Sequence, residues 1–306
     1  MRGDPSLGAA FARVADALRW GEEQLRKGRI PGARLQATLL LGHAMKLSRA
    51  QVLACLAEPV LLGPAHDYRG LVARRAAHEP LQYLRGRAAF LDFEVRVNPG
   101  VFIPRPETEL VVEAALRVWP STGSLTAGPG WAVDVGTGSG AIALALAQAR
   151  PGTRVCGLDR SREALDTARA NAERLQVLNR LLLIRGDLLA PLGTNGGRAP
   201  DRIREAVGLV VSNPPYAPAD ADVQPEVRQH EPREAWAAGP TGMEVYARLI
   251  PQAAELLLPG RPLVLELGWG QDGPLTELLA ADGRWQQPQI EPDFQEIPRV
   301  LTVIRA

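Results

Sequence analysis

Apolar residues in the first part of the chain recur at the spacing of helices. Four of them, three or four positions apart, share one helix face: Leu7, Phe11, Val14 and Leu18. Ser48 stands three positions before Gln51 and ahead of a further apolar run, an arrangement typical of a capping box at a helix start. Prolines separate these segments. The pattern predicts a bundle of four or five short helices, and we assign residues 1–84 to an N-terminal helical domain.

The period changes to two after residue 85. Phe93, Val95 and Val97 alternate with polar residues, which predicts a half-buried strand. Asn98-Pro99-Gly100 then predicts a turn into a second strand over residues 101–103. Residues 85–104 are therefore expected to form a hairpin linker between two domains.

Short apolar runs separated by helical patterns fill the remainder, residues 105–306. The expected strands are Trp131–Val135, Val155–Asp159, Leu181–Ile184, Leu209–Ser212 and Leu263–Leu267. Alternation of strand and helix predicts an α/β fold with a parallel sheet covered by helices on both faces. Residues 190–201 are rich in Gly and Pro and are expected to form a mobile surface loop.

Composition excludes several classes of protein. A length of 306 residues suits two domains, and 35 basic against 34 acidic side chains create no field that would attract nucleic acid. No apolar run approaches the roughly 18 residues of a membrane span, and the N-terminus lacks the form of a secretory signal. Neither the cysteines nor the histidines have the spacing of metal ligands. We expect a cytoplasmic monomer without a bound metal.

The first predicted strand of the second domain ends in a glycine-rich turn, Gly136-Thr137-Gly138-Ser139-Gly140, followed by a helical run from Ala141. Glycines without a Cβ let a ligand approach the backbone, and such a turn is expected to leave amide groups facing the ligand. The turn also satisfies the dinucleotide pattern GxGxxG/A, so by itself it does not separate NAD from S-adenosylmethionine.

Two acids follow the next two strands. Asp159 ends the second strand, where a carboxylate can accept hydrogen bonds from both ribose hydroxyls of an adenosine. Asp187 follows the third strand, within reach of an adenine edge in a sheet of the usual winding. Three ligand-facing features at successive strand ends favour an adenosine-containing cofactor over two solvated acids and a tight turn.

The fourth strand runs into Ser212-Asn213-Pro214-Pro215-Tyr216, at the carboxyl edge where α/β sheets bind ligands. Oxygen acceptors on the Asn213 side chain and the Pro214 carbonyl could hold both N–H groups of a planar nitrogen, orient it and stabilise positive charge on it. Tyr216 could stack on the planar group, and consecutive prolines keep the turn rigid. The competing interpretation is a rigid turn that only ends a strand.

At this point the chain resembles the release factor glutamine methyltransferases, often called the HemK or PrmC type. The resemblance covers the chain from about Pro80 to the C-terminus. It rests on the glycine-rich segment 133–147, on SNPPY at 212–216 and on segments typical of the family: Pro80–Leu84, Phe102–Glu109, His230–Pro232 and Gly242–Glu244. A helical N-terminal domain and a Rossmann-like catalytic domain of the class I S-adenosylmethionine-dependent type are implied.

The resemblance also implies a cofactor, a substrate and site residues. S-adenosyl-L-methionine would bind through Gly136–Gly140, Asp159, Asp187, Leu188 and Asn213, and the substrate glutamine through Asn213, Pro214, Pro215 and Tyr216. The catalytic residues would be Asn213, Pro214 and Tyr216. The substrate would be the glutamine of the Gly-Gly-Gln loop of class I peptide chain release factors, which the N-terminal domain would help to hold.

Some points remain open in the sequence. Leu188 replaces an aromatic residue found in some members of the family, and Glu107 and Glu109 either reach the site or begin a solvated helix. A related class of enzymes methylates a glutamine of a large-subunit ribosomal protein, but Arg105-Pro106-Glu107 favours the release factor. A second alternative is an amino-methyltransferase acting on adenine in DNA or RNA, which the near-zero charge disfavours. A third is a cofactor-binding protein without catalysis, which would leave the Asn-Pro-Pro-Tyr turn with nothing to bind.

Overall fold

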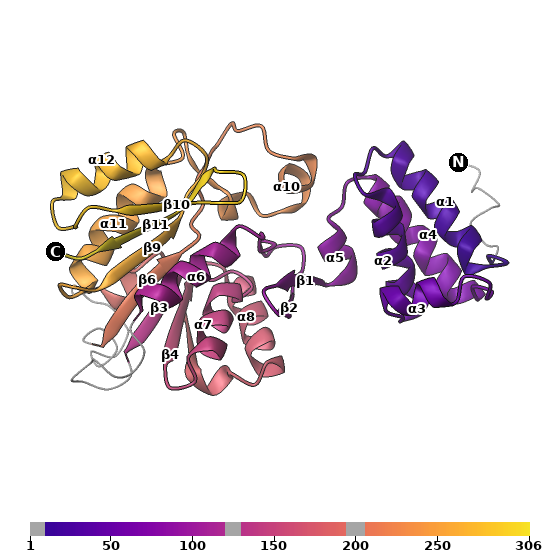
Figure 1. Cartoon of the computed structure of the whole chain (residues 1–306), viewed down its shortest axis with the longest axis horizontal. Helices are drawn as coiled ribbons and strands as arrows, with labels where there is room; N and C mark the ends of the chain where they lie inside the picture. The colour runs from indigo at the N-terminus through magenta and orange to yellow at the C-terminus, as the bar shows by residue number, and fades with distance from the viewer. Residues whose placement is uncertain (1–9, 120–129, 194–205) are drawn as a thin grey trace. The chain divides into compact units, whose positions relative to one another are not determined.

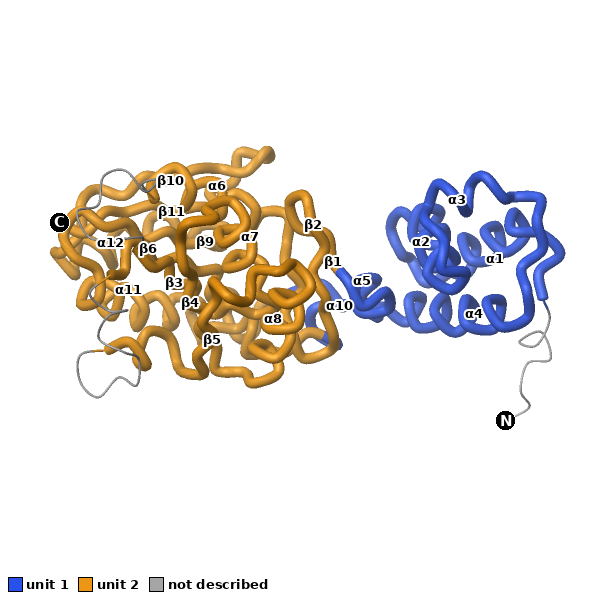
Figure 2. Tube along the Cα trace, turned by 90° about the horizontal axis from the view of Figure 1, so that it is seen from below, with its two compact units in different colours: residues 1–87, 223–230 blue, residues 88–222, 231–306 orange. Residues whose placement is uncertain are grey.

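The computed structural model describes residues 10–119, 130–193 and 206–306. These residues form two compact units, coloured separately in Figure 2. The first unit contains the chain up to Arg87 together with Val223–His230, and the second contains Ala88–Asp222 and Glu231–Ala306. Most of the Gly/Pro-rich stretch predicted as a loop, from residue 194 onward, lies outside the described residues.

Helices make up the first unit, as predicted. Within its described residues before the hairpin they are α1 (Val14–Lys27), α2 (Ala33–Met45), α3 (Arg49–Ala54), α4 (Leu62–Ala76) and α5 (Leu81–Arg85). Val14, Leu18 and Leu25 of α1 are fully buried and belong to one apolar core with residues of α2 and α4. The predicted capping box is present, because Ser48 and Gln51 each accept the other's backbone N–H at the start of α3.

The first helix begins later than its apolar spacing suggests. Leu7 lies outside the described residues, and Phe11 precedes the helix and forms a β-bridge with Val60. Backbone pairing decides this start: the Val60 N–H donates to the Phe11 carbonyl at 3.1 Å, and the Val14 N–H donates to the Glu58 carbonyl at 2.8 Å. Phe11 is still buried, so the apolar periodicity continues beyond the helix itself.

A hairpin lies within residues 85–104, but its turn and one of its strands are not the predicted ones. β1 (Arg87–Phe90) pairs with β2 (Phe93–Arg96) around a turn at Leu91, whose N–H donates to the Glu109 carboxylate at 2.8 Å. Asn98-Pro99-Gly100 does form a turn, but the segment after it is not a strand. The Ile103 N–H donates to the buried Glu231 carboxylate at 3.2 Å, so a side chain takes the place of a partner strand.

The second unit is built on a seven-stranded sheet in the order β10-β11-β9-β6-β3-β4-β5, seen nearly edge-on in Figure 1. Its strands are β3 (Trp131–Val135), β4 (Arg154–Asp159), β5 (Leu181–Arg185), β6 (Val207–Ser212), β9 (Pro262–Glu266), β10 (Gln289–Pro292) and β11 (Pro298–Ile304). The five predicted strands are parallel to one another, as expected.

Two strands that the sequence pattern did not indicate make one edge of the sheet antiparallel. β11 pairs antiparallel with β9, and β10 pairs antiparallel with β11. A short turn joins β10 to β11, and the Asp293 carboxylate accepts the N–H groups of Gln295 and Ile297 within it. Since a short turn reverses the chain without a crossover helix, this edge is antiparallel.

Helices cover both faces of the sheet (Figure 1), with α6, α7 and α8 on one face and α11 and α12 on the other. Their bounds are α6 (Thr108–Val118), α7 (Ala141–Ala149), α8 (Arg162–Arg174), α11 (Glu244–Leu256) and α12 (Asp272–Asp282). Val133 and Val135 of β3 belong to the apolar core under α11 and α12. Asp134 between them faces the opposite side, where its carboxylate accepts the Ala143 N–H of α7.

A segment far along the sequence belongs to the first unit. It contains the short helix α10 (Pro225–His230). Arg75 of α4, which is 4% exposed, donates to the Glu226 carboxylate at 2.8 Å. Arg75 also donates to Gln36 at 2.7 Å and to the Glu79 carbonyl at 3.0 Å, so the contact is part of a buried hydrogen-bond network.

Candidate active site

The sheet order brings the two sequence motifs together. β3 and β6 are parallel neighbours, and Val135 pairs with Ser212 at their carboxyl ends. Gly136 and Asn213 therefore leave the sheet side by side, and a Cβ built on Gly136 would lie 4.0 Å from the Asn213 carbonyl oxygen. The strand order reverses between β3 and β6, since β4 and β5 continue to one side and β9 to the other. Such a switch point is where open α/β sheets bind ligands.

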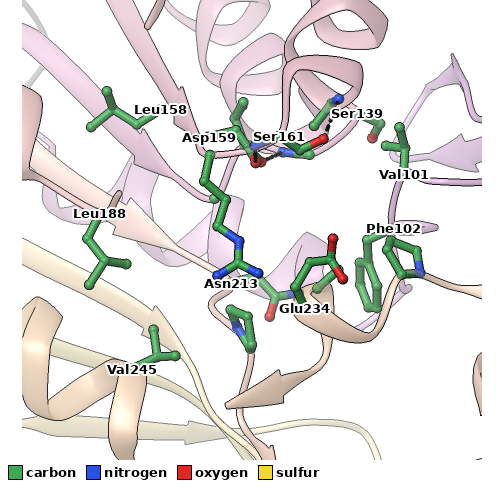
Figure 3. A pocket seen from close by; sticks show the side chains of 18 of the residues that line it. Val101, Phe102, Ser139, Leu158, Asp159, Ser161, Leu188, Asn213, Glu234 and Val245 are labelled. Carbon is green, nitrogen blue, oxygen red and sulfur yellow. Dashed lines mark hydrogen bonds between the residues drawn. The ribbon is translucent and has the colours of Figure 1, made fainter. Parts of the chain in front are cut away.

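A cavity of about 250 Å³ opens at this switch point. Leu158, Leu188 and Val245 lie at one end, and Phe102 and Glu234 lie at the other, with Asn213 between them (Figure 3). The site residues predicted from the sequence that line the cavity are Gly136, Thr137, Gly138, Ser139, Asp159, Asp187, Leu188, Asn213 and Pro215. Those that do not line it are Gly140, Pro214 and Tyr216.

The glycine turn has the backbone geometry that glycine supplies. Gly136, Gly138 and Gly140 have φ angles of 73°, 55° and 86°, in the left-handed region. The expectation that the turn leaves its amides for a ligand is wrong for most of them. The N–H groups of Gly136 and Thr137 donate to the Leu158 carbonyl, that of Gly138 to Asp159, and that of Gly140 to Thr137. The turn thus lets a ligand approach the backbone closely at its glycines, but it offers few free N–H groups to bind that ligand.

Asp134 ties the glycine turn to the following helix. Its carboxylate is fully buried and accepts the Thr137 hydroxyl at 2.6 Å and the Ala143 N–H at 3.1 Å. Burial raises the pKa of this carboxyl group to about 7, although both hydrogen bonds oppose the rise. Asp134 therefore holds the turn and does not line the cavity.

Asp159 stands where the sequence places it, at the end of β4. One carboxylate oxygen accepts the Gly138 N–H at 2.9 Å and the other accepts the Ser161 N–H at 2.8 Å. Burial raises the pKa of the Asp159 carboxyl group, and these backbone hydrogen bonds oppose the rise. A carboxylate oxygen accepts more than one hydrogen bond, so each can also accept from a ribose hydroxyl in the cavity.

Asp187 follows β5 at the rim of the cavity. Its carboxylate is exposed and forms an ion pair with Arg248 of α11, which also lines the cavity. The neighbouring Leu188 has a φ of 48° and lines the cavity. The backbone next to Leu188 is held by a side chain, because the Leu189 N–H donates to the Gln252 side-chain oxygen at 2.9 Å.

The Asn213 amide is held from one side. Its Nδ2 donates to the Thr108 hydroxyl at 3.0 Å, and Thr108 is a buried residue in the first turn of α6. An asparagine that donates its N–H₂ group to the protein keeps its oxygen for another partner. Asn213 lines the cavity (Figure 3), so that partner can be a ligand.

Tyr216 has a different position from the one predicted. Its hydroxyl donates to the buried Glu266 carboxyl at 3.3 Å, and a Cβ on Gly268 would lie 2.9 Å from its ring. Burial raises the pKa of the Tyr216 hydroxyl above its usual value. Since the side chain points into the interior, Tyr216 supports the Asn213 turn from behind and does not form a stacking wall. Glu266 was not identified from the sequence.

The linker before α6 supplies residues that the sequence only partly indicated. Thr108 lines the cavity, whereas Glu107 and Glu109 do not. Phe102 also lines it, and the Arg105 guanidinium lies 4.7 Å from the centre of its ring. Glu231 anchors this linker, because its buried carboxylate accepts from Arg105 as well as from the Ile103 N–H. The only indication in the sequence that this linker reaches the site was the motif at residues 102–109, which is similar to that of the family.

The comparisons with known proteins agree with this geometry. A release factor glutamine methyltransferase from Moorella thermoacetica is 40% identical over 95% of this chain and 98% of its own length. The chain belongs to the release factor glutamine methyltransferase family. Another member, from Geobacter sulfurreducens, is 39% identical over 88% of this chain and 89% of its own.

Family models match both parts of the chain. One described as PrmC N-terminal domain matches residues 16–86, and one described as methyltransferase domain matches residues 131–192. Among solved structures, the hMettl16 catalytic domain in complex with the MAT2A 3'UTR hairpin 6 has a TM-score of 0.52 and 16% identity, covering 76% of this chain and 81% of its own. That likeness shows the shared class I methyltransferase fold.

A member of this family uses S-adenosyl-L-methionine, and the cavity suits it. Asp159 offers carboxylate oxygens for a ribose, and the apolar end formed by Leu158, Leu188 and Val245 can hold an adenine ring. The glycine turn has no Cβ where a cofactor must approach. Among the residues that the structure describes, no cluster of side chains could hold a metal ion, and no helix is long and apolar enough to cross a membrane.

Proposed function

We propose that this protein transfers a methyl group from S-adenosyl-L-methionine to the side-chain amide nitrogen of the glutamine in the Gly-Gly-Gln loop of class I peptide chain release factors. The observation that carries the proposal is the Asn213 turn beside the glycine turn, in a chain related over nearly its whole length to release factor glutamine methyltransferases. The reaction would take place in the cytoplasm, where translation terminates.

In this proposal the two ends of the cavity have different roles. Gly136–Ser139, Asp159, Asp187 and Leu188 hold the cofactor, which supplies an activated methyl group. Phe102 and Glu234, at the other end of the cavity (Figure 3), would lie beside the glutamine. Asn213 lies between the ends, where a methyl donor and an amide acceptor can meet.

The chemistry requires that an unreactive nitrogen be held in place. An amide nitrogen is a poor nucleophile, because its lone pair is delocalised into the carbonyl group. The Asn213 side-chain oxygen, on a residue that lines the cavity, accepts one N–H group of the substrate amide, orients the nitrogen and stabilises the positive charge that develops on it. The second acceptor expected from the sequence, the Pro214 carbonyl, belongs to a residue that does not line the cavity. No strong base is needed, since the spare proton is released to water after transfer.

The first unit is proposed to bind the release factor away from the reacting group. Such remote contacts supply binding energy that positions the amide without taking part in the chemistry. The near-equal numbers of basic and acidic side chains agree with a protein partner better than with nucleic acid. We expect the enzyme to act as a monomer.

Methyl transfer from a labelled cofactor tests the function directly. The purified protein is expected to label a class I release factor, and changing the glutamine of its Gly-Gly-Gln loop to alanine is expected to abolish labelling. A large-subunit ribosomal protein and bulk tRNA or DNA serve as competing substrates. Equal labelling of the glutamine variant, or preferential labelling of a competitor, would overturn the assignment.

A further inference from the structure

A nearly buried glutamine contacts the backbone of the turn that carries Asn213. Gln271 is 9% exposed and stands immediately before α12. The start of the helix fixes its backbone, because the Gln271 N–H donates to the Gly268 carbonyl at 3.2 Å and the Leu275 N–H donates to the Gln271 carbonyl at 2.9 Å. The side chain therefore extends from a fixed point of the second unit.

The side-chain amide of Gln271 forms hydrogen bonds with three backbone groups. Its Oε1 accepts the Gly268 N–H at 2.9 Å, and its Nε2 donates to the Tyr216 carbonyl at 2.8 Å and to the Gly242 carbonyl at 3.4 Å. A backbone N–H can only donate and a backbone carbonyl can only accept, so these partners determine the orientation of the amide. A flipped amide would lose all three hydrogen bonds.

Two glycines leave room for this side chain. A Cβ on Gly268 would lie 2.9 Å from Gln271 Oε1. A Cβ on Gly242 would lie 2.9 Å from Gln271 Nε2 and would clash with the Tyr216 carbonyl oxygen. Gly242 also has a φ of 82°, in the left-handed region. Three segments of the chain thus meet closely at this one glutamine.

The turn at residues 212–216 depends on such contacts, because its centre consists of two prolines, which have no N–H group to donate. At its first end, the Ser212 hydroxyl donates to the Val135 carbonyl at 2.6 Å. At its second end, the Gln271 amide donates to the Tyr216 carbonyl. The asparagine of the turn lies between these two contacts, so its position depends on both.

We propose that Gln271 is a positioning residue for methyl transfer, whose side-chain amide holds the turn at Tyr216 so that the Asn213 oxygen keeps its place at the cavity. The inference rests on the function proposed above. Gln271 does not line the cavity, so it acts through the turn and not on the substrate. Since a displacement of about 1 Å can cost on the order of 10²-fold in rate, loss of this contact should slow the reaction.

The substitution Gln271→Glu tests the role with little change of shape. It keeps an oxygen for the Gly268 N–H, but at pH 8 it replaces the donating N–H₂ group with an acceptor that faces the Tyr216 and Gly242 carbonyls. We expect kcat for labelling of the release factor to fall at least about tenfold. The cofactor dissociation constant should stay within about twofold, because Gln271 contacts none of the residues assigned to the cofactor.

Two control variants change polar residues elsewhere in the second unit. Thr276→Val removes the hydrogen bond that its hydroxyl donates to the Asp272 carbonyl at 2.8 Å in α12, and Thr302→Val changes a buried polar residue of β11. Neither residue lines the cavity, so both variants should keep the wild-type kcat. If Gln271→Glu does not fold, Gln271→Met replaces it with the same expectations, because methionine has a similar length and donates no hydrogen bond.

A measurement without turnover separates this inference from the proposed function. The Ala217 N–H, next to the turn, donates to the Trp236 carbonyl at 2.9 Å. Amide hydrogen exchange in residues 216–219 is expected to be faster in Gln271→Glu than in the wild type and unchanged in both controls. Unchanged exchange, or an unchanged kcat, overturns the positioning role. Faster exchange in a protein whose wild type labels no release factor supports the hold of Gln271 on the turn and overturns the proposed function.

Discussion

Asn213 presents two different atoms to its surroundings. The nitrogen of its side chain is held by Thr108, and the oxygen belongs to a residue that lines the cavity. This division explains why an asparagine suits the position: a carboxylate would lose the donor to Thr108 and would add a negative charge next to the methyl donor.

Removing the Asn213 side chain is expected to affect the chemical step more than cofactor binding. Asn213→Ala should lower kcat by roughly 10²–10³, the usual effect of removing one group that stabilises developing charge. Isothermal titration calorimetry should show a cofactor dissociation constant close to that of the wild type. A collapse of cofactor affinity would contradict the division of roles between Asn213 and the glycine turn.

Glu266 is expected to make stability depend on pH. In the folded protein its carboxyl group keeps a proton up to pH about 7, whereas an exposed glutamate releases its proton near pH 4.3. The folded state binds more protons in this window, so this group's contribution to the free energy of unfolding falls as the pH rises from about 4 to 7.

The substitution Glu266→Gln removes that dependence. We compare the free energy of unfolding of the variant with that of the wild type at each pH. The variant-minus-wild-type difference should be more favourable at pH 8 than at pH 5 by about 1–3 kcal/mol. Urea unfolding at the two pH values measures it, with Thr302→Val as the control that should show no such difference. Asp134 titrates in the same range but is present in both proteins, so its contribution cancels.

At the scale of elements, the connection between β3 and α7 combines two requirements. The backbone must turn sharply through left-handed conformations, and the space above it must remain empty for a ligand. Asp134 stabilises the turn from inside the fold, so the residues facing the cavity can remain small.

A methyl group on Gly136 tests the second requirement. Gly136→Ala strains a residue with a φ of 73° and places a Cβ at the cavity, so cofactor affinity should fall at least about tenfold and stability by about 1 kcal/mol. Gly283→Ala is the matched control, because Gly283 has a φ of 71° and open space around it at the end of α12. The control should lose similar stability in thermal unfolding and keep full cofactor affinity.

At the scale of the whole molecule, the chain passes between the two units more than once. It leaves the first unit after Arg87, returns for Val223–His230 and leaves again at Glu231. Glu231 then anchors the linker at Ile103 and Arg105. Glu231, which contacts the linker, thus directly follows His230, the last residue of the first-unit segment.

The contact between Arg75 and Glu226 is expected to hold the returning segment. Glu226→Ala should increase amide hydrogen exchange in residues 223–230, because Arg75 keeps Gln36 and the Glu79 carbonyl as partners while the segment loses its anchor. Mass spectrometry of exchanged peptides measures this, with Glu291→Ala, at an exposed ion pair with Arg117, as the control. Unchanged exchange in residues 223–230 would show that other contacts hold the segment.

The sequence by itself determined the helical first part, the parallel strands and the two turns at the carboxyl ends of β3 and β6. These features depend on local rules: the period of apolar residues, the need for glycine at positive φ, and the position of polar residues at strand ends. The positions of Asp159 and Asn213 were predictable for this reason, since Asp159 is the last residue of β4 and Asn213 directly follows β6.

Tertiary structure decided what depends on contacts between distant residues. The pairing of β11 with β9, the role of Glu231 in place of a strand partner and the inward direction of Tyr216 each join segments far apart in the chain. Glu266 looks like an ordinary strand end in the sequence. Only the fold buries it and brings the Tyr216 hydroxyl to it, and burial makes a hydrogen bond of a carboxyl group costly to lose.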